Sequence, residues 1–119
     1  MPKILIVDDS ATDRALIRET LESEGYEVNS AADGAAAIQS VADHHPDVVL
    51  LDVVMPGENG FKVCRKLKKA KEGPKPRVVL VTSKDGESDK FWGMKQGADA
   101  YLTKPFESAE LLRTVKQLL

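Results

Sequence analysis

The sequence contains a single cysteine, Cys64, so the chain cannot close an internal disulfide bond or build a cysteine-based metal site. Long hydrophobic runs are also missing, and the short apolar stretches that exist cannot cross a bilayer. The N-terminal segment MPKILIVDD has an apolar run too short for a signal peptide and ends on two acids. These absences predict a cytoplasmic protein that does not insert into a membrane.

A large excess of charge of either sign is absent as well. The formal net charge is −2 and the isoelectric point is about 5.7, which gives no bulk attraction to nucleic acid or to anionic membranes. The lysine-rich segment 62–75 contains no aromatic residue, so we interpret it as a solvated helix face rather than a nucleic-acid patch. With 42% hydrophobic and 30% charged residues over 119 positions, the composition predicts one globular domain spanning residues 1–119.

What the sequence does contain is an alternation of short apolar runs with helical patterns. Runs rich in β-branched residues are typical of strands buried on both faces of a parallel sheet, and they cover residues 3–7, 48–51 and 78–81, with weaker runs at 26–31 and 100–102. Helical patterns lie between and after them, at residues 10–25, 35–43, following Gly60, at 88–96, and from Pro105 to the end.

The helical patterns also predict caps and buried faces. Ser10, with Asp13 three residues later, is expected to cap the first helix, and Ser108 the last. We expect the buried stripe of the first helix to contain Leu16, Ile17 and Leu21, and that of the third to contain Phe61, Val63, Cys64 and Leu67. In the fourth helix, neighbours Phe91 and Trp92 cannot share one face, so we expect one in the core and the other exposed, where it either contacts a partner or only packs locally.

This order predicts an α/β fold in which a strand and a helix alternate five times. Such alternation produces a parallel sheet with right-handed crossovers and helices on both faces. We therefore predict a flavodoxin-like (βα)5 three-layer sandwich with strand order 2-1-3-4-5. In this class ligands bind beyond the carboxyl ends of the strands, near the point where the order reverses.

Polar residues end four of the five expected strands. Asp8 and Asp9 follow the first, Asp52 the third, Thr82 and Ser83 the fourth, and Thr103, Lys104 and Pro105 the fifth. Since strands one and three are neighbours in the expected order, three carboxylates meet at one edge, where two charges about 4 Å apart repel by about 4 kcal/mol. One ammonium group, from Lys104, does not neutralise three acids, and a cation bound by oxygens such as Mg²⁺ does. Taken singly, an aspartate after a strand is usually a turn residue or a helix cap, but that explanation would have to hold by coincidence at the ends of four strands.

The motifs KILIVDDS, DVVLLDVVMPGENG, VVLVTSK and GADAYLTKPF resemble those of bacterial response-regulator receiver domains, the CheY-like family of two-component signalling. The resemblance implies that Asp52 is the phosphoacceptor, which takes a phosphoryl group from a partner histidine kinase. It implies that Asp9, Asp52 and the backbone carbonyl of Val54 bind Mg²⁺, and that Asp8 acts through a metal-bound water. It also implies that Lys104 pairs with Asp52 and then with the phosphoryl group, and that the Lys104–Pro105 peptide is cis.

The same resemblance implies a switch. The Thr82 hydroxyl would turn toward the phosphoryl group, Tyr101 would rotate inward, and a surface made of helix four, strand five and helix five would bind a protein target. We expect no direct nucleic-acid binding and a monomer or weak homodimer. The segment TSKDGESDKFWGMKQGADAYLTKP is also similar to single-domain regulators of the chemotaxis-type systems that control type IV pili.

Other functions are compatible with parts of the pattern. A phosphatase of the haloacid dehalogenase type needs a second acid two residues after the phosphorylated aspartate, where this chain has Val54. A flavodoxin-like cofactor carrier needs glycine and hydroxyl donors where this chain has Asp8 and Asp9, which repel phosphate. A receiver fold that acts without phosphorylation, as an interaction module, or one that serves as a phosphate sink, stays open. Apolar Val54 cannot position an attacking water, so we expect dephosphorylation to differ from that of relatives with a polar residue there.

Overall fold

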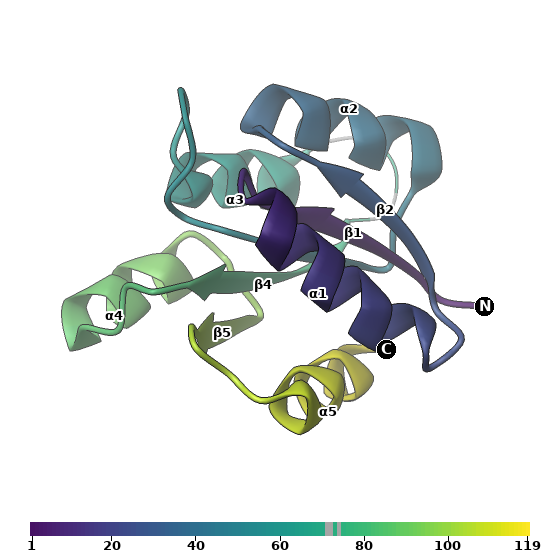
Figure 1. Cartoon of the computed structure of the whole chain (residues 1–119). Helices are drawn as coiled ribbons and strands as arrows, with labels where there is room; N and C mark the ends of the chain where they lie inside the picture. The colour runs from purple at the N-terminus through teal and green to yellow at the C-terminus, as the bar shows by residue number, and fades with distance from the viewer. Residues whose placement is uncertain (71–72, 74) are drawn as a thin grey trace.

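The structure, a computed structural model, describes residues 1–70, 73 and 75–119. Lys71, Glu72 and Pro74, which belong to the lysine-rich segment, lie outside the described residues. In the described part, strands and helices alternate along the chain, as Figure 1 shows, with the bounds β1 (Lys3–Val7), α1 (Ala11–Glu22), β2 (Glu27–Ala31), α2 (Gly34–His44), β3 (Val48–Leu51), α3 (Gly60–Lys69), β4 (Arg77–Thr82), α4 (Glu87–Lys95), β5 (Ala100–Thr103) and α5 (Ser108–Leu118). Across the same residues, every helix lacks the length and apolar character needed to span a membrane.

The strands form one parallel sheet in the order β2-β1-β3-β4-β5, which confirms the predicted topology. The register pairs Val7 of β1 with Leu51 of β3, so these two strands end side by side. On the other side of β3, Leu51 is paired with Leu80 of β4. The residues that follow β1 and β3 are therefore brought to the same edge of the sheet, at the point where the strand order reverses.

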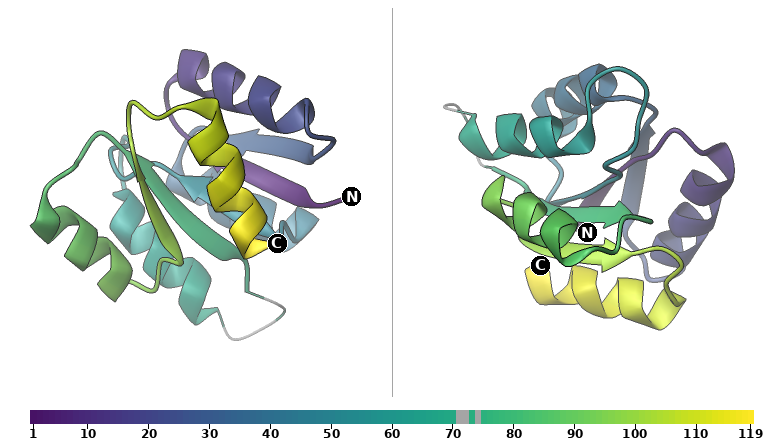
Figure 2. Two further views of the ribbon diagram at one scale, coloured as in Figure 1. Left: turned by 90° about the horizontal axis from the view of Figure 1, so that it is seen from below. Right: turned by 90° about the vertical axis from the view of Figure 1, so that its left-hand side faces the viewer.

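Two hydrophobic cores lie on opposite faces of the sheet. The first packs α2 and α3 against it through side chains such as Ala37, Val63 and Leu67, and the second packs α1 and α5 through Ile17, Leu21, Leu111 and Val115. Figure 2 shows α5, in yellow, and α1, in purple, on the face opposite to α2 and α3. Cys64 is fully buried in the first core, as expected, and Phe61 packs against that core while partly buried. This is the predicted three-layer sandwich.

The helix caps agree with the sequence at one end of the chain and differ at the other. The Ser10 hydroxyl accepts a hydrogen bond from the Asp13 N–H at 3.2 Å, which confirms the cap of α1. The prediction for Ser108 is wrong: it is the first residue of α5, and Glu107 is the cap residue, without a side-chain cap bond. The backbone of Glu107 is extended, so α5 begins at Ser108, one residue earlier than a cap at Ser108 would require.

Two expectations about burial are also wrong. Leu16 is 59% exposed, because α1 turns Ile17 and Leu21, four residues apart, toward the sheet and leaves Leu16 beside that face. Phe91 and Trp92 are both exposed, at 63% and 55%. The buried residue of α4 is Gly93, where a Cβ would lie 2.7 Å from Leu80 Cδ1, so the helix packs on the sheet through backbone and turns both aromatic rings outward.

Candidate functional site

The strand ladder itself positions two of the predicted site residues. The Asp52 N–H donates to the Val7 carbonyl at 2.9 Å, and the Asp8 N–H donates to the Ala31 carbonyl at 3.2 Å. Each aspartate therefore extends the hydrogen bonding of its strand by one step before the chain turns away. Because their backbones belong to the ladder, the two carboxylates occupy fixed positions at the carboxyl edge of the sheet.

The side chains of Asp8 and Asp52 are held in the same way. One oxygen of each accepts a backbone N–H two residues on, from Ser10 at 2.9 Å and from Val54 at 3.0 Å. These are Asx turns, in which a short carboxylate replaces a backbone acceptor. The side chains are only 3% and 10% exposed, so both charges are largely removed from water. A buried carboxylate of this kind needs a positive partner.

Lys104 is that partner. Its ammonium donates to Asp8 at 2.7 Å, to Asp13 at 2.8 Å and to Asp52 at 3.2 Å. Burial acts to lower the pKa of Lys104, but hydrogen bonds to Asp13 and Asp8 and the nearby charge of Asp52 outweigh it and raise the pKa above its usual value. The ammonium therefore stays charged. The Lys104–Pro105 peptide is cis, which confirms the expectation from the resemblance.

The carboxylates of Asp8, Asp9 and Asp52 come within 4.8 Å of one another and are arranged so that they could bind a metal ion. Asp9 is exposed, whereas the other two are buried, so the group opens to solvent on one side. Arg14 donates to the backbone oxygen of Asp8 and not to a carboxylate. The ammonium of Lys104 also binds Asp13, so it does not offset the charges of Asp8, Asp9 and Asp52, and negative charge is left in excess. Oxygen-only ligands of this kind fit a hard divalent cation such as Mg²⁺.

Thr82 is the last residue of β4, and Tyr101 lies within the neighbouring strand β5. Thr82 is fully buried, and its hydroxyl accepts the Lys84 N–H at 3.4 Å. The Tyr101 hydroxyl donates to the Lys84 carbonyl at 2.6 Å, so both side chains contact the loop that follows β4. Burial, followed by the charges of Asp89, Asp52 and Asp85, raises the pKa of the Tyr101 phenol.

Comparison of the chain with known proteins identifies the family to which it belongs. The model of the response regulator receiver domain matches residues 4–116. The chain belongs to the response regulator receiver domain family. Its sequence is 45% identical to protein PilH of Pseudomonas aeruginosa over 119 residues, which are 100% of this chain and 98% of that protein.

Solved structures agree with the family. The chemotaxis response regulator CheY4 of Vibrio cholerae superposes with a TM-score of 0.92 at 34% identity, covering 100% of this chain and 99% of that one. The BeF3-activated N-terminal receiver domain of Klebsiella pneumoniae RstA superposes with a TM-score of 0.88 at 32% identity, covering 97% and 96%. These likenesses place the chain among two-component signalling proteins.

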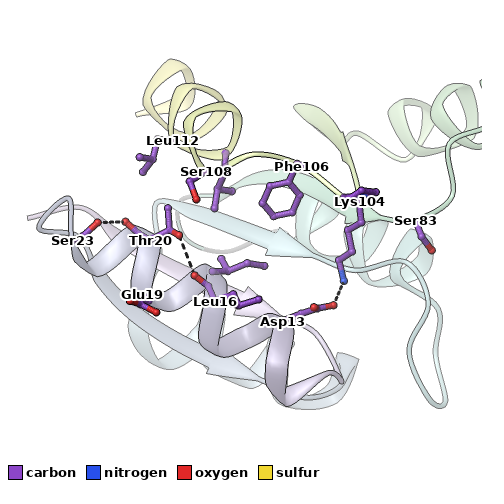
Figure 3. Close-up of a pocket in the computed structure, with 13 residues that line it drawn as sticks. Asp13, Leu16, Glu19, Thr20, Ser23, Ser83, Lys104, Phe106, Ser108 and Leu112 are labelled. Carbon is purple, nitrogen blue, oxygen red and sulfur yellow. Dashed lines mark hydrogen bonds and ion pairs between the residues drawn. The ribbon is translucent and has the colours of Figure 1, made fainter.

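A pocket of this receiver domain, with a volume of about 780 Å³, lies between α1 and α5 beside the acid cluster (Figure 3). Leu16, Phe106 and Leu112 give it an apolar lining, and Asp13 and Lys104 point toward each other at one end of it. Leu16, which is exposed, therefore borders this pocket. The sequence contained a signal for it, since Leu16 lies one helical turn after Asp13 on the same side of α1.

Sequence reasoning gave Asp13 a role only in helix capping and did not predict that its carboxylate belongs to the site. The Asp13 backbone caps, while its carboxylate binds Lys104, 91 residues away in sequence. The sequence did contain a signal for this contact. Asp13 lies in the first turn of α1, which begins at the edge of the sheet where the strands end, so its side chain can reach the site. Val54, by contrast, is 54% exposed, and its N–H is used by Asp52.

Proposed function

We propose that residues 1–119 act as one receiver domain that accepts a phosphoryl group from a histidine kinase on Asp52. The observation that carries this proposal is the state of the Asp52 carboxylate, which is nearly buried and bound by a backbone N–H on one oxygen and an ammonium on the other. A carboxylate held on both oxygens in this way has a fixed direction. It is placed to attack a phosphorus atom as a nucleophile, displacing the kinase's histidine nitrogen as the leaving group.

Asp9 and Asp52, with the backbone carbonyl of Val54, would hold Mg²⁺, and Asp8 would act through a metal-bound water. When bound, this ion supplies charge that offsets the negative charge of the transferring phosphoryl group. The support in this chain is the donor set, which consists of carboxylates within 4.8 Å of one another.

Lys104 and Thr82 act on the phosphoryl group itself, and Tyr101 responds to the change. Lys104 donates to a phosphoryl oxygen and so stabilises the negative charge that gathers there. Thr82 turns its hydroxyl to a second phosphoryl oxygen, giving up the Lys84 N–H that it now accepts. Tyr101, whose hydroxyl bond to Lys84 depends on the same loop, rotates inward as that loop moves.

We infer that α4, β5 and α5 form the surface that reads this change. Tyr101 belongs to β5 and its ring lies against Gly93 of α4, so movement of the tyrosine reaches the helix directly. Phe91 and Trp92 are exposed on α4, and exposed aromatic side chains concentrate at binding hot spots. The target is a protein and not nucleic acid, and the domain is a monomer or weak homodimer in the cytoplasm. The likeness to PilH supports a place in a chemotaxis-type system that controls type IV pili.

The test is incubation with acetyl phosphate and Mg²⁺, followed by intact-mass measurement. We expect the wild-type chain to gain the mass of one phosphoryl group, and Asp52→Asn and metal-chelated samples to gain none. The control is Asp33→Asn, which removes the charge of the cap residue of α2 but keeps an oxygen that can accept the Ala36 N–H, and which leaves Asp8, Asp9 and Asp52 in place, so it should be modified like wild type. A folded wild-type protein that gains no mass would favour a receiver fold that acts without phosphorylation.

A further inference from the structure

The ammonium of Lys104 has all its hydrogen-bond donors in use. A lysine ammonium carries three N–H groups, and in this structure Lys104 donates to three carboxylates, those of Asp8, Asp13 and Asp52. A phosphoryl oxygen that binds Lys104 must therefore take over a donor from one of them. Bonding of the phosphoryl group to Asp52 removes the charge of that carboxylate and frees the donor it held. The question is which of the other two carboxylates, Asp8 or Asp13, gives up a further donor at the lower cost.

Burial answers that question. The Asp8 side chain is 3% exposed, whereas that of Asp13 is 39% exposed. A buried carboxylate that loses its cation becomes an uncompensated charge away from water, which is strongly unfavourable. Asp13 borders the pocket between α1 and α5 (Figure 3). Its exposure allows solvent to take the place of a lost hydrogen bond. Asp13 is therefore the partner that can be released.

We propose that Asp13 is a positioning residue that draws Lys104 toward α1 in the resting protein and competes with the phosphoryl group for it. The proposal rests on the proposed phosphorylation of Asp52. The distances agree with it, since the ammonium lies 2.8 Å from Asp13 and 3.2 Å from the phosphoacceptor. The contact joins the first turn of α1 to the end of β5, so phosphorylation also loosens one rim of the pocket.

Competition predicts that removing the charge of Asp13 helps a phosphoryl-like ligand to bind. The probe is beryllofluoride with saturating Mg²⁺, titrated against wild type, Asp13→Asn, Asp13→Glu and Glu19→Gln. We expect Asp13→Asn to bind about two- to five-fold more tightly, the range of a partly exposed ion pair, and Asp13→Glu to return to the wild-type value. Glu19→Gln removes the same charge from the same helix, at an exposed position bordering the same pocket, and should leave affinity unchanged.

A double-mutant cycle with Lys104→Ala identifies the route of the effect. In that background Asp13→Asn should no longer change beryllofluoride affinity, because the group for which it competes is gone. The four proteins of this cycle, which are wild type, Asp13→Asn, Lys104→Ala and the double variant, are also unfolded in urea without metal. There Asp13→Asn should destabilise the protein more when Lys104 is present than when it is absent. This second readout needs neither metal nor phosphate.

Several results would overturn the proposal. They are an unchanged or weaker affinity in Asp13→Asn, an equal gain in Glu19→Gln, a gain that persists without Lys104, or no coupling in urea. Failure of the proposed function looks different, because then wild type itself would bind no beryllofluoride, while the urea cycle would still report whether Asp13 and Lys104 are coupled.

Discussion

Replacing Gly60 by alanine tests whether the position of Asp52 depends on the start of α3. The Gly60 N–H donates to the Val53 carbonyl at 2.9 Å, so the first turn of the helix lies directly against the chain that follows β3. A Cβ at Gly60 would press on the Asp52 carbonyl oxygen and would lie 2.6 Å from Val53 Cα and 2.9 Å from the Asp52 carbonyl carbon. All three are backbone atoms, so no side-chain rotation relieves the overlap.

The size of the effect follows from these distances. Ordinary contact begins at 3.4 Å, so the loop at Asp52 or the helix must shift by about 1 Å, and a displacement of that size at a reacting group costs about 10²-fold in rate. Overpacking of this kind also destabilises proteins by about 1–3 kcal/mol. Gly60→Ala should therefore fold with reduced stability and be phosphorylated by acetyl phosphate about a hundred times more slowly than wild type.

The assay measures the phosphorylation rate by intact mass and the stability by urea unfolding. Gly86→Ala is the matched control, since this glycine precedes α4 with an ordinary φ of −67°, and a Cβ there would meet only the end of the Asp89 side chain at 3.0 Å. It should lose a few tenths of a kcal/mol and keep its rate. A wild-type rate in folded Gly60→Ala would refute the reasoning that contact with this helix fixes the phosphoacceptor.

Three further predictions concern charge, water and the buried thiol. In the absence of metal, Asp52→Asn should raise the free energy of unfolding by about 1 kcal/mol, because a charge repelled by Asp8 and Asp9 is removed. The same variant should gain less stability from Mg²⁺ than wild type. Thermal unfolding in which the metal-free variant is less stable than metal-free wild type would contradict this. Val54→Asn should change the rate of phosphate loss, because an amide can position water that the apolar side chain cannot; an unchanged decay of the phosphorylated protein would exclude that role. Burial raises the pKa of the Cys64 thiol from 9.0 to about 11. The folded chain thus keeps a proton that the unfolded chain releases, so stability should fall as pH rises across that window, with a shallower fall in Cys64→Ala when urea unfolding is followed against pH.

The features that sequence reasoning predicted correctly are those that depend on local patterns. The apolar runs predicted the strands, and their alternation with helices predicted the parallel sheet. In the structure, the register of β1 and β3 brings Asp8 and Asp52 together at one edge of that sheet. No long-range contact had to be known in advance. The boundaries differ by a residue or more, as in β4, which extends at both ends beyond the expected 78–81 because Arg77 and Thr82 also pair in the sheet.

The features that could not be predicted depend on which surface a helix meets. α4 contacts the sheet through Gly93, so a pattern based on its large side chains placed one aromatic ring in a core that holds neither. Leu16 has an apolar side chain, which favours burial, but it lines the pocket between α1 and α5 instead. The bond between Asp13 and Lys104 joins residues far apart in the chain, and only the fold, which brings the first turn of α1 next to the residue that follows β5, creates it.

The account depends most directly on the affinity of the carboxylate cluster for a divalent cation next to Asp52. Titration of the isotope-labelled protein with Mg²⁺, followed by amide NMR, measures this affinity without any phosphate donor. We predict saturable shifts at millimolar Mg²⁺ that concentrate at residues 8–10 and 52–54, and their loss in Asp9→Asn. Amide signals at these positions that do not move with Mg²⁺ in the folded wild-type protein would contradict the account.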